Sequence, residues 1–260
     1  MRISAISSSN YSYNKDIYNI YSKLSSGKRI NKAADDAAGL AIAKKLQRQE
    51  TGLNVSAQNV KDGMGVMNVA DGAIGGMTDY LQRIRELALR ASNGIYSDSD
   101  RETFQTEIDS LKEGIQSLAK NTSINEQTLL DGSMADMNLA TNPEGGGLNI
   151  SMANTTLEAL GIADFDVSSG KFDLSVIDKA MDKISGARSN MGAYTNRLNY
   201  TYNVNLGTAE NTTRSRSRIE DLDLPVAVSE KKKKDILMQY RNMMQRNIMN
   251  QRSSVRLLFQ

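Results

Sequence analysis

Asp35 and Asp36 form the most conspicuous carboxylate pair in the sequence, and paired carboxylates are a common arrangement for acid–base chemistry. On a helix, adjacent side chains point about 100° apart, so these two do not converge on one substrate atom. Their position favours a different role, because acidic side chains stabilise the amino terminus of a helix. We therefore expect no catalytic residue in this pair.

Composition removes most other chemistry. The chain of 260 residues has no Cys and no His. Thiol catalysis, disulfides and nearly all zinc sites are thereby excluded, and so is the usual general base near neutral pH. We predict a protein that is not an enzyme, with no cofactor and no metal site.

The elements are predicted by apolar residues that recur at alternating gaps of three and four, which is typical of helices packed as a coiled coil. Ser97 and Asp100 are suited to cap the second helix, so the first two should form an antiparallel hairpin, and the third should return along them. The three seams are Val60, Met64, Met67, Ala70, Ile74, Met77, Leu81, Ile84, Ala88 and Ala91; Phe104, Ile108, Leu111, Ile115 and Leu118; and Ile177, Ala180, Ile184, Ala187, Met191, Tyr194, Leu198 and Thr201.

Five glycines, at positions 63, 65, 72, 75 and 76, interrupt the first seam, and we expect close packing against neighbours to compensate for their low helix propensity. Residues 148–152 alternate as in a strand, and residues 165–167 do so more weakly. The predicted fold is mainly α: a long antiparallel helical hairpin, a returning helix and a small β-hairpin element.

The two ends of the chain carry apolar stripes that they cannot bury alone. Residues 229–260 also hold eight basic side chains against two acidic ones, a net of +6. A basic tail of this kind suits nucleic acid, an acidic membrane or an acidic partner. No apolar run approaches the roughly 20 residues needed to span a bilayer, and the start of the chain lacks the apolar centre of a cleavable secretory signal.

Several segments resemble bacterial flagellin, the subunit of the flagellar filament. Residues 22–49 (SKLSSGKRINKAADDAAGLAIAKKLQRQ) are similar to the family's amino-terminal signature, and residues 81–94 (LQRIRELALRASNG) to its central helix. Residues 99–108 and 125–132 resemble the second helix, and residues 192–223 the returning helix. The resemblance covers about residues 20–133 and 175–237, in order.

The resemblance implies an amino-terminal inner-core segment at 1–32, an outer-core hairpin at 33–133, a reduced variable element at 134–172, a returning helix at 173–217 and a carboxyl-terminal inner-core segment at 218–260. It implies a secreted, extracellular protein that self-assembles into the bacterial flagellum for motility, with termini that become helical on assembly. The implied partners are further copies of the chain, an export chaperone, the filament cap and the flagellin-sensing Toll-like receptor of the host. No nucleic acid or membrane partner is expected.

The resemblance also assigns residues. Receptor recognition falls on Gln82, Arg83, Arg85, Leu87 and Glu107. The assembly seam is expected to include Leu24, Leu40, Ile42, Ile236, Leu237, Leu257 and Leu258.

The carboxyl-terminal segment departs from the family pattern. Flagellins normally have an Ala- and Gln-rich helix after the position of Ser229, whereas this chain has Lys231 to Lys234 followed by Met, Arg and Tyr residues. Burying unpaired charges in a crowded tube costs several kcal/mol. The alternatives are therefore a specialised flagellin that polymerises poorly, the hook–filament junction protein and, more distantly, a nucleic-acid-binding coiled coil.

Overall fold

The computed structural model describes the backbone of residues 15–257 and the side chains of residues 15–251. Contacts divide the chain into two compact units, which we call the terminal unit (residues 1–50 and 210–260) and the middle unit (residues 51–209). The divisions expected after residues 32 and 217 follow sequence motifs instead, and they stay predictions.

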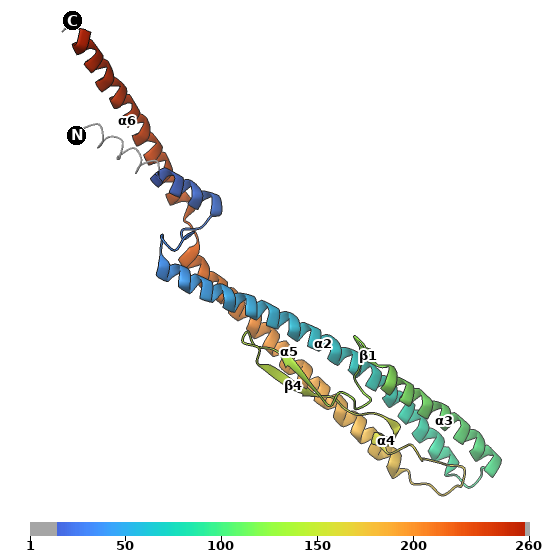
Figure 1. Ribbon diagram of the computed structural model, residues 1–260. Coiled ribbons are helices and arrows are strands. Elements are labelled where there is room, and N and C mark those ends of the chain that lie inside the picture. The colour runs from blue at the N-terminus through green and yellow to red at the C-terminus, as the bar shows by residue number, and fades with distance from the viewer. Residues whose placement is uncertain (1–14, 258–260) are drawn as a thin grey trace. The chain divides into compact units, whose positions relative to one another are not determined.

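Long helices make up most of the described chain (Figure 1). After a helical segment at residues 15–26, the long helices are α2 (Ala37–Ala91), α3 (Asp98–Asn121), α5 (Ser175–Glu220) and α6 (Leu224–Leu257). The prediction of a mainly α fold is confirmed. Among the described residues, no helix is long and apolar enough to cross a membrane.

The capping expected for α3 is confirmed. The Ser97 hydroxyl accepts a hydrogen bond from Asp100 N, and the Asp100 carboxylate accepts one from Ser97 N at 3.0 Å. This reciprocal capping box satisfies two backbone N–H groups at the point where the chain turns back from α2.

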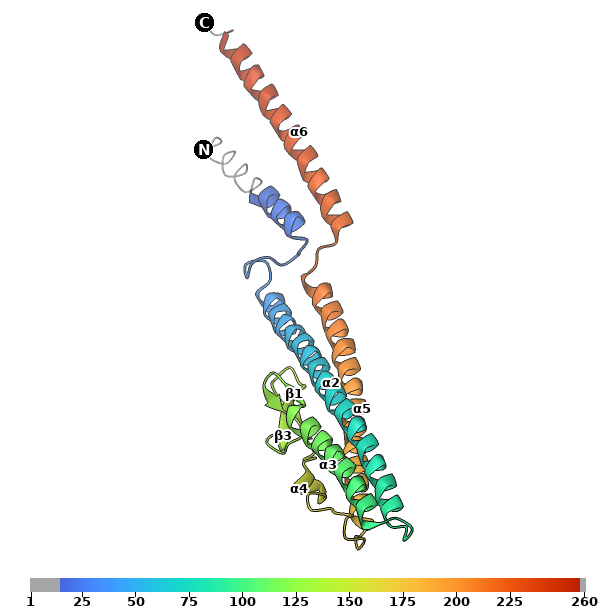
Figure 2. The ribbon, with the colours of Figure 1, turned by 90° about the vertical axis from the view of Figure 1, so that its right-hand side faces the viewer.

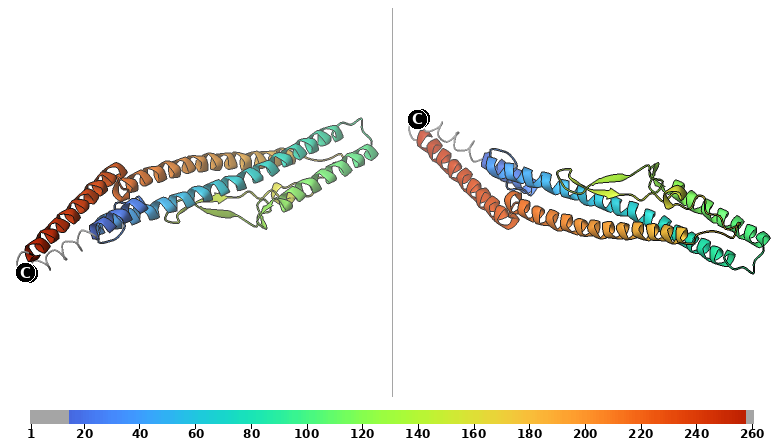
Figure 3. Two further views of the ribbon diagram at one scale, coloured as in Figure 1. Left: turned by 90° about the horizontal axis from the view of Figure 1, so that it is seen from above. Right: turned by 90° about the horizontal axis from the view of Figure 1, so that it is seen from below.

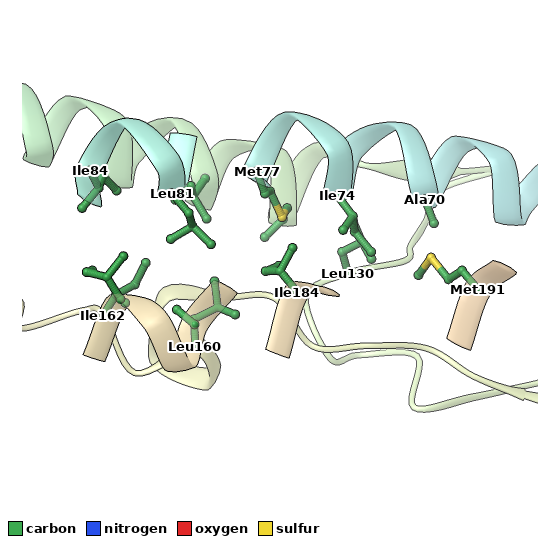
Figure 4. Close-up of a cluster of buried hydrophobic side chains, with 14 of the residues drawn as sticks. Ala70, Ile74, Met77, Leu81, Ile84, Leu130, Leu160, Ile162, Ile184 and Met191 are labelled. Atoms are coloured by element: carbon green, nitrogen blue, oxygen red, sulfur yellow. The ribbon is translucent and has the colours of Figure 1, made fainter. Parts of the chain in front are cut away.

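In the middle unit, α3 and α5 lie beside α2 (Figures 2 and 3). Every residue of the first predicted seam except the half-buried Met64 is buried. In Figure 4 the side chains of Ala70, Ile74, Met77, Leu81 and Ile84 point from α2 toward Leu130, Leu160, Ile162, Ile184 and Met191. The core is therefore a thin layer of aliphatic side chains between helices, as the low aromatic content indicates.

The segment between α3 and α5 contains two small antiparallel sheets and the single turn of α4 (Leu157–Leu160). β1 (Ser123–Ile124) pairs with β2 (Gln127–Thr128), and β3 (Asp136–Ala140) pairs with β4 (Gly147–Ser151). The strand expected at residues 148–152 is confirmed as β4, and Leu148 and Ile150 bury the apolar face that the alternation predicts.

The second expected strand, at residues 165–167, is wrong. Instead of a neighbouring strand, the side chain of Gln105 on α3 bonds the backbone of this loop. Its amide accepts a hydrogen bond from Val167 N at 2.9 Å and donates one to Phe165 O at 3.4 Å. The alternation reflects Phe165 and Val167 turning into the helical core, not a ladder with another strand.

Close packing at the glycines of α2 is only partly confirmed. A Cβ at Gly63 would lie 2.3 Å from Leu139 Cδ2 on β3, so the leucine packs closely against this glycine. At Gly65, Gly72 and Gly75 a Cβ would meet nothing within 4 Å. For these three positions the expectation of a compensating contact within the chain is wrong.

Candidate functional site

The described parts of the two terminal segments are joined at a short backbone pairing in the terminal unit. Arg29 N donates to Glu220 O at 2.7 Å, Leu222 N donates to Gly27 O at 2.9 Å, and Lys28 and Asp221 form an isolated β-bridge. We call residues 27–31 and 219–222 the clasp. Gly27 permits it because its φ of +67° lies in the left-handed region that glycine adopts without strain.

Glu220 is the charged centre of the clasp. It is only 4% exposed, its carboxylate accepts a hydrogen bond from Lys28 Nζ at 2.5 Å, and Arg216 lies 3.3 Å from its second oxygen. The hydrogen bond from Lys28 lowers the pKa of Glu220 most, and the charge of Arg216 adds to the effect. Arg216 also pairs with Glu50 on α2 at 3.0 Å, so the network joins α5 both to Lys28 of the clasp and to α2.

The carboxylates of Asp35 and Asp36 hold two neighbouring pieces of backbone. Asp36 accepts a hydrogen bond from Gly39 N at 2.8 Å and so caps α2, which begins at Ala37. This confirms the helix-terminal role that is expected for the pair. Asp35 accepts from Asn31 N and Lys32 N at 3.1 and 3.0 Å, and these bonds lower its pKa. Asp35 therefore fixes the loop before the helix.

Beyond the clasp, α6 contacts the helical segment at residues 15–26. Lys231 Nζ lies 4.6 Å from the centre of the Tyr21 ring, and Lys234 pairs with Asp16 at 3.5 Å. Large apolar side chains elsewhere on α6 stay exposed: Ile236 is 64%, Tyr240 58% and Met243 60% exposed. The terminal unit thus presents an apolar surface that the described chain does not cover.

The residues predicted for the assembly seam lie on this unit with different exposures. Leu24 and Leu40 are half-buried, whereas Ile42, Ile236 and Leu237 are exposed. Leu257 is the last residue of α6, with its side chain outside the described part, and Leu258 lies outside the described residues.

The residues assigned to receptor recognition lie in the middle unit, and four of the five reach its surface. Arg83 on α2 donates to Glu107 on α3 at 2.8 Å and pairs with Glu86 at 3.2 Å; the hydrogen bond to Glu107 is the main cause that raises the pKa of Arg83. Arg85 pairs with Asp178 on α5 at 2.7 Å. Gln82 is exposed.

Leu87, the fifth residue assigned to receptor recognition, does not reach that surface. Its side chain is 1% exposed and belongs to the core of the middle unit, because it faces the other helices and not solvent. In this structure it cannot contact a partner directly, and it supports the helices that carry Arg83 and Glu107.

Sequence reasoning did not single out Glu220, Lys28 or Arg216. The signal available was weak, since Arg216 lies only four residues from Glu220 but Lys28 lies 192 residues away, and nothing in the sequence indicates that second contact.

Comparisons with known proteins follow the same division of the chain. The model of the bacterial flagellin N-terminal helical region matches residues 1–135, and that of the bacterial flagellin C-terminal helical region matches residues 174–258. The gap between the two matches contains β3, β4 and α4. The helical parts thus carry the family signal, and the small β element does not.

Full-length relatives agree. The flagellar filament core protein flaB2 of Brachyspira hyodysenteriae is 33% identical over 260 residues, covering 92% of this chain and 91% of the relative. The flagellin of Bacillus subtilis (strain 168) is 35% identical over 255 residues, covering 84% of each.

Solved structures give the same fold. The crystal structure of Bacillus cereus flagellin matches with a TM-score of 0.51 and 25% identity, over 56% of this chain and 88% of that one. A putative flagellar hook-associated protein from Vibrio parahaemolyticus matches with a TM-score of 0.60 over 72% of this chain and all of that one, and at 16% identity it supports the fold alone. With two family models that together span most of its helices and relatives matched nearly end to end, this chain belongs to the bacterial flagellin family.

Proposed function

We propose that this chain is a structural subunit that self-assembles into the extracellular filament of the bacterial flagellum. The observation that carries the proposal is the exposed apolar surface of the terminal unit, above all Ile236, Tyr240 and Met243 on α6. Such side chains gain about 25 cal/mol for each Å² that leaves water, so contact with further subunits stabilises them. The names of the relatives, flagellin and flagellar filament core protein, support the same role.

Polymerisation of the purified chain onto filament seeds, followed by electron microscopy, tests the proposal. Ile236→Asp should raise the critical subunit concentration about tenfold or more, because it places a charge where apolar contact is expected. Ile95→Asp is the matched control, since Ile95 is also exposed but lies in the middle unit at the turn between α2 and α3. Equal polymerisation of both variants and the parent chain would count against the assigned surface.

Filament length separates the two structural alternatives. A filament subunit adds indefinitely to its own kind, whereas a hook–filament junction protein stops after a short zone. The match of both flagellin family models favours the filament subunit. Short caps on seeds, with no growth at high subunit concentration, would favour the junction protein or a specialised flagellin.

The proposed partners follow from this role. The export chaperone is expected on the carboxyl-terminal segment before secretion, and the filament cap at the growing end. Recognition by the host Toll-like receptor is proposed for the surface around Arg83 and Glu107. What supports it is the exposure of Gln82 and the presence of Arg83 and Glu107 at one edge of the α2–α3 hairpin, held together by a direct ion pair.

A further inference from the structure

We propose that α6 of the unassembled subunit binds the surface of anionic lipid bilayers, with its apolar side in the headgroup region and its cations on lipid phosphates. This goes beyond filament formation and does not depend on it. The absence of a membrane-spanning helix among the described residues does not bear on it, because a helix lying in the interface needs no span.

The first step concerns the four consecutive lysines. Successive helical residues point about 100° apart, so Lys231 to Lys234 surround the helix axis. Lys231 and Lys234 point to one side, where they contact Tyr21 and Asp16 of the segment 15–26. Lys232 and Lys233 point to the opposite side and are exposed. We call this opposite side the open face of α6.

The second step is that most of the exposed apolar residues of α6 share the open face, whereas Met238 and Met249 lie on the opposite side. Ile236, Tyr240, Met243, Met244 and Ile248 follow one another at helical spacing, and all five are exposed. Near the start of the helix the same side holds a shallow groove of about 390 Å³ lined by Pro225, Val226, Ser229, Glu230 and Lys233. The open face is therefore apolar along several turns.

The third step is the placing of charge around that face. By the helical period, Lys232 and Arg241 border the apolar residues on its two sides, and Asp235 points away. At the amino-terminal end Lys233 lies among them, and Glu230 lies at the edge that holds Arg241. An apolar stripe bordered by lysine and arginine is the pattern of helices that lie in a bilayer interface, because the long stems snorkel to the phosphates. Nucleic acid would use the cations but leave the methionines and Ile236 in water.

The fourth step is charge at the level of the whole unit. Over the full sequence, the terminal unit has 20 basic and 10 acidic side chains, a net of +10, whereas the middle unit has 12 basic and 20 acidic ones, a net of −8. An anionic surface therefore attracts the terminal unit selectively. The positive charge of the unit and the exposed apolar stripe of α6 together fit an anionic bilayer.

Flotation of the full-length monomer with lipid vesicles, without filament seeds, tests the proposal. The monomer should bind vesicles of phosphatidylcholine mixed with phosphatidylglycerol and not vesicles of phosphatidylcholine alone. Lys232→Gln with Lys233→Gln should weaken the partitioning about 30-fold, from the usual contribution of two cations near an anionic surface. Lys44→Gln with Lys45→Gln is the matched control, since these adjacent lysines are exposed on α2 in the same unit.

A second pair of variants tests the apolar part. Ile236→Gln with Met243→Gln should reduce binding to a similar extent, whereas Val55→Gln with Val69→Gln, at exposed positions of α2, should leave it unchanged. No binding to the anionic vesicles, equal binding to both vesicle types, or full binding by the Ile236 and Met243 variant would overturn the proposal. Light scattering provides a further test. If it shows that the chain self-associates and that excess anionic vesicles do not dissociate it, a second copy of the chain occupies the open face, and the proposal is overturned.

Discussion

Ile30 lies directly over Gly39, so that a Cβ added at Gly39 would come within 2.8 Å of Ile30 Cδ1 and 2.4 Å of Asp36 Oδ2. Ile30 is buried, and Asp36 caps α2, in whose first turn Gly39 lies. The glycine within the family-like segment at residues 22–49 is thus closely packed between the clasp loop and the first turn of α2. Both the stability of the terminal unit and the capping of α2 by Asp36 therefore depend on this contact.

Gly39→Ala should destabilise the terminal unit by about 1–3 kcal/mol, because the methyl group displaces either Ile30 or the capping carboxylate. The measurement is chemical denaturation followed by hydrogen exchange of the amides at residues 28–40. Gly65→Ala is the matched control. Position 65 is helical with nothing within 4 Å of the added Cβ, so this change should stabilise α2 by about 0.5–1 kcal/mol. Equal effects of both substitutions would contradict the contact.

Much of the middle unit could be predicted from sequence, because its burial follows the helical period. The seam from Val60 to Ala91 needs only local spacing to identify it, and it lies in the core as expected. The loop at Phe165 and Val167 could not be distinguished from a strand, since alternation shows which side chains are buried but not what bonds their backbone. Gly63 needed Leu139, which lies 76 positions away, before its role could be seen.

The candidate site residues also divide into those whose role is set by nearby sequence and those whose role depends on distant contacts. Asp36 acts within three residues, so its capping role was readable. The Glu220 network joins residues about 190 positions apart, and Leu87 is buried by neighbours from other helices. The family resemblance identifies positions, but exposure is a property of the three-dimensional packing.

Removing the charge of Glu220 should loosen the clasp. Glu220→Gln leaves Lys28 without its carboxylate partner, and we expect a loss of about 1–2 kcal/mol in the stability of the terminal unit, since Lys28 is partly solvated. The amide exchange of Arg29 and Leu222 should accelerate, because both N–H groups bond across the clasp. Lys28→Gln should give an effect of the same sign, and an unchanged exchange rate in both variants would contradict the network.

The pH dependence of the clasp follows from the same carboxylate. Lys28 and Arg216 lower the pKa of Glu220 below its ordinary 4.5, so the unfolded chain takes up the proton first as the pH falls. The stabilisation is therefore complete above that ordinary pKa and is lost as the pH falls through the lower pKa of the folded state. Hydrogen exchange at Leu222 measured at decreasing pH, after correction for the intrinsic rate, should show this loss, and Glu220→Gln should abolish it.

A change at Arg83 should affect receptor recognition but not the stability of the fold. Arg83→Ala should reduce receptor signalling with little change in the free energy of unfolding, because its pair with Glu107 is exposed and screened by solvent. Arg188→Ala is the matched control, since Arg188 forms a similarly exposed pair with Asp71 on another part of the middle unit. Leu87→Ala should instead cost about 2–5 kcal/mol as a buried substitution. Loss of signalling in the Arg188 variant as well would mean that the assay reports folding and not a surface.

The four consecutive lysines of α6, Lys231 to Lys234, should limit polymerisation at low ionic strength. In a filament each copy brings a terminal unit with a net charge of +10 toward its neighbours, and like charges are poorly screened when salt is dilute. Changing Lys231 to Lys234 together to Gln should lower the critical subunit concentration in dilute buffer, and added NaCl should produce the same change in the parent chain. At high salt the two proteins should converge, because screening then removes the repulsion in both. The changes Lys44→Gln and Lys45→Gln, outside α6, should have a smaller effect. If the parent chain polymerises equally well at low and high salt, repulsion at α6 does not control assembly, and the unusual carboxyl-terminal helix is compatible with ordinary filaments.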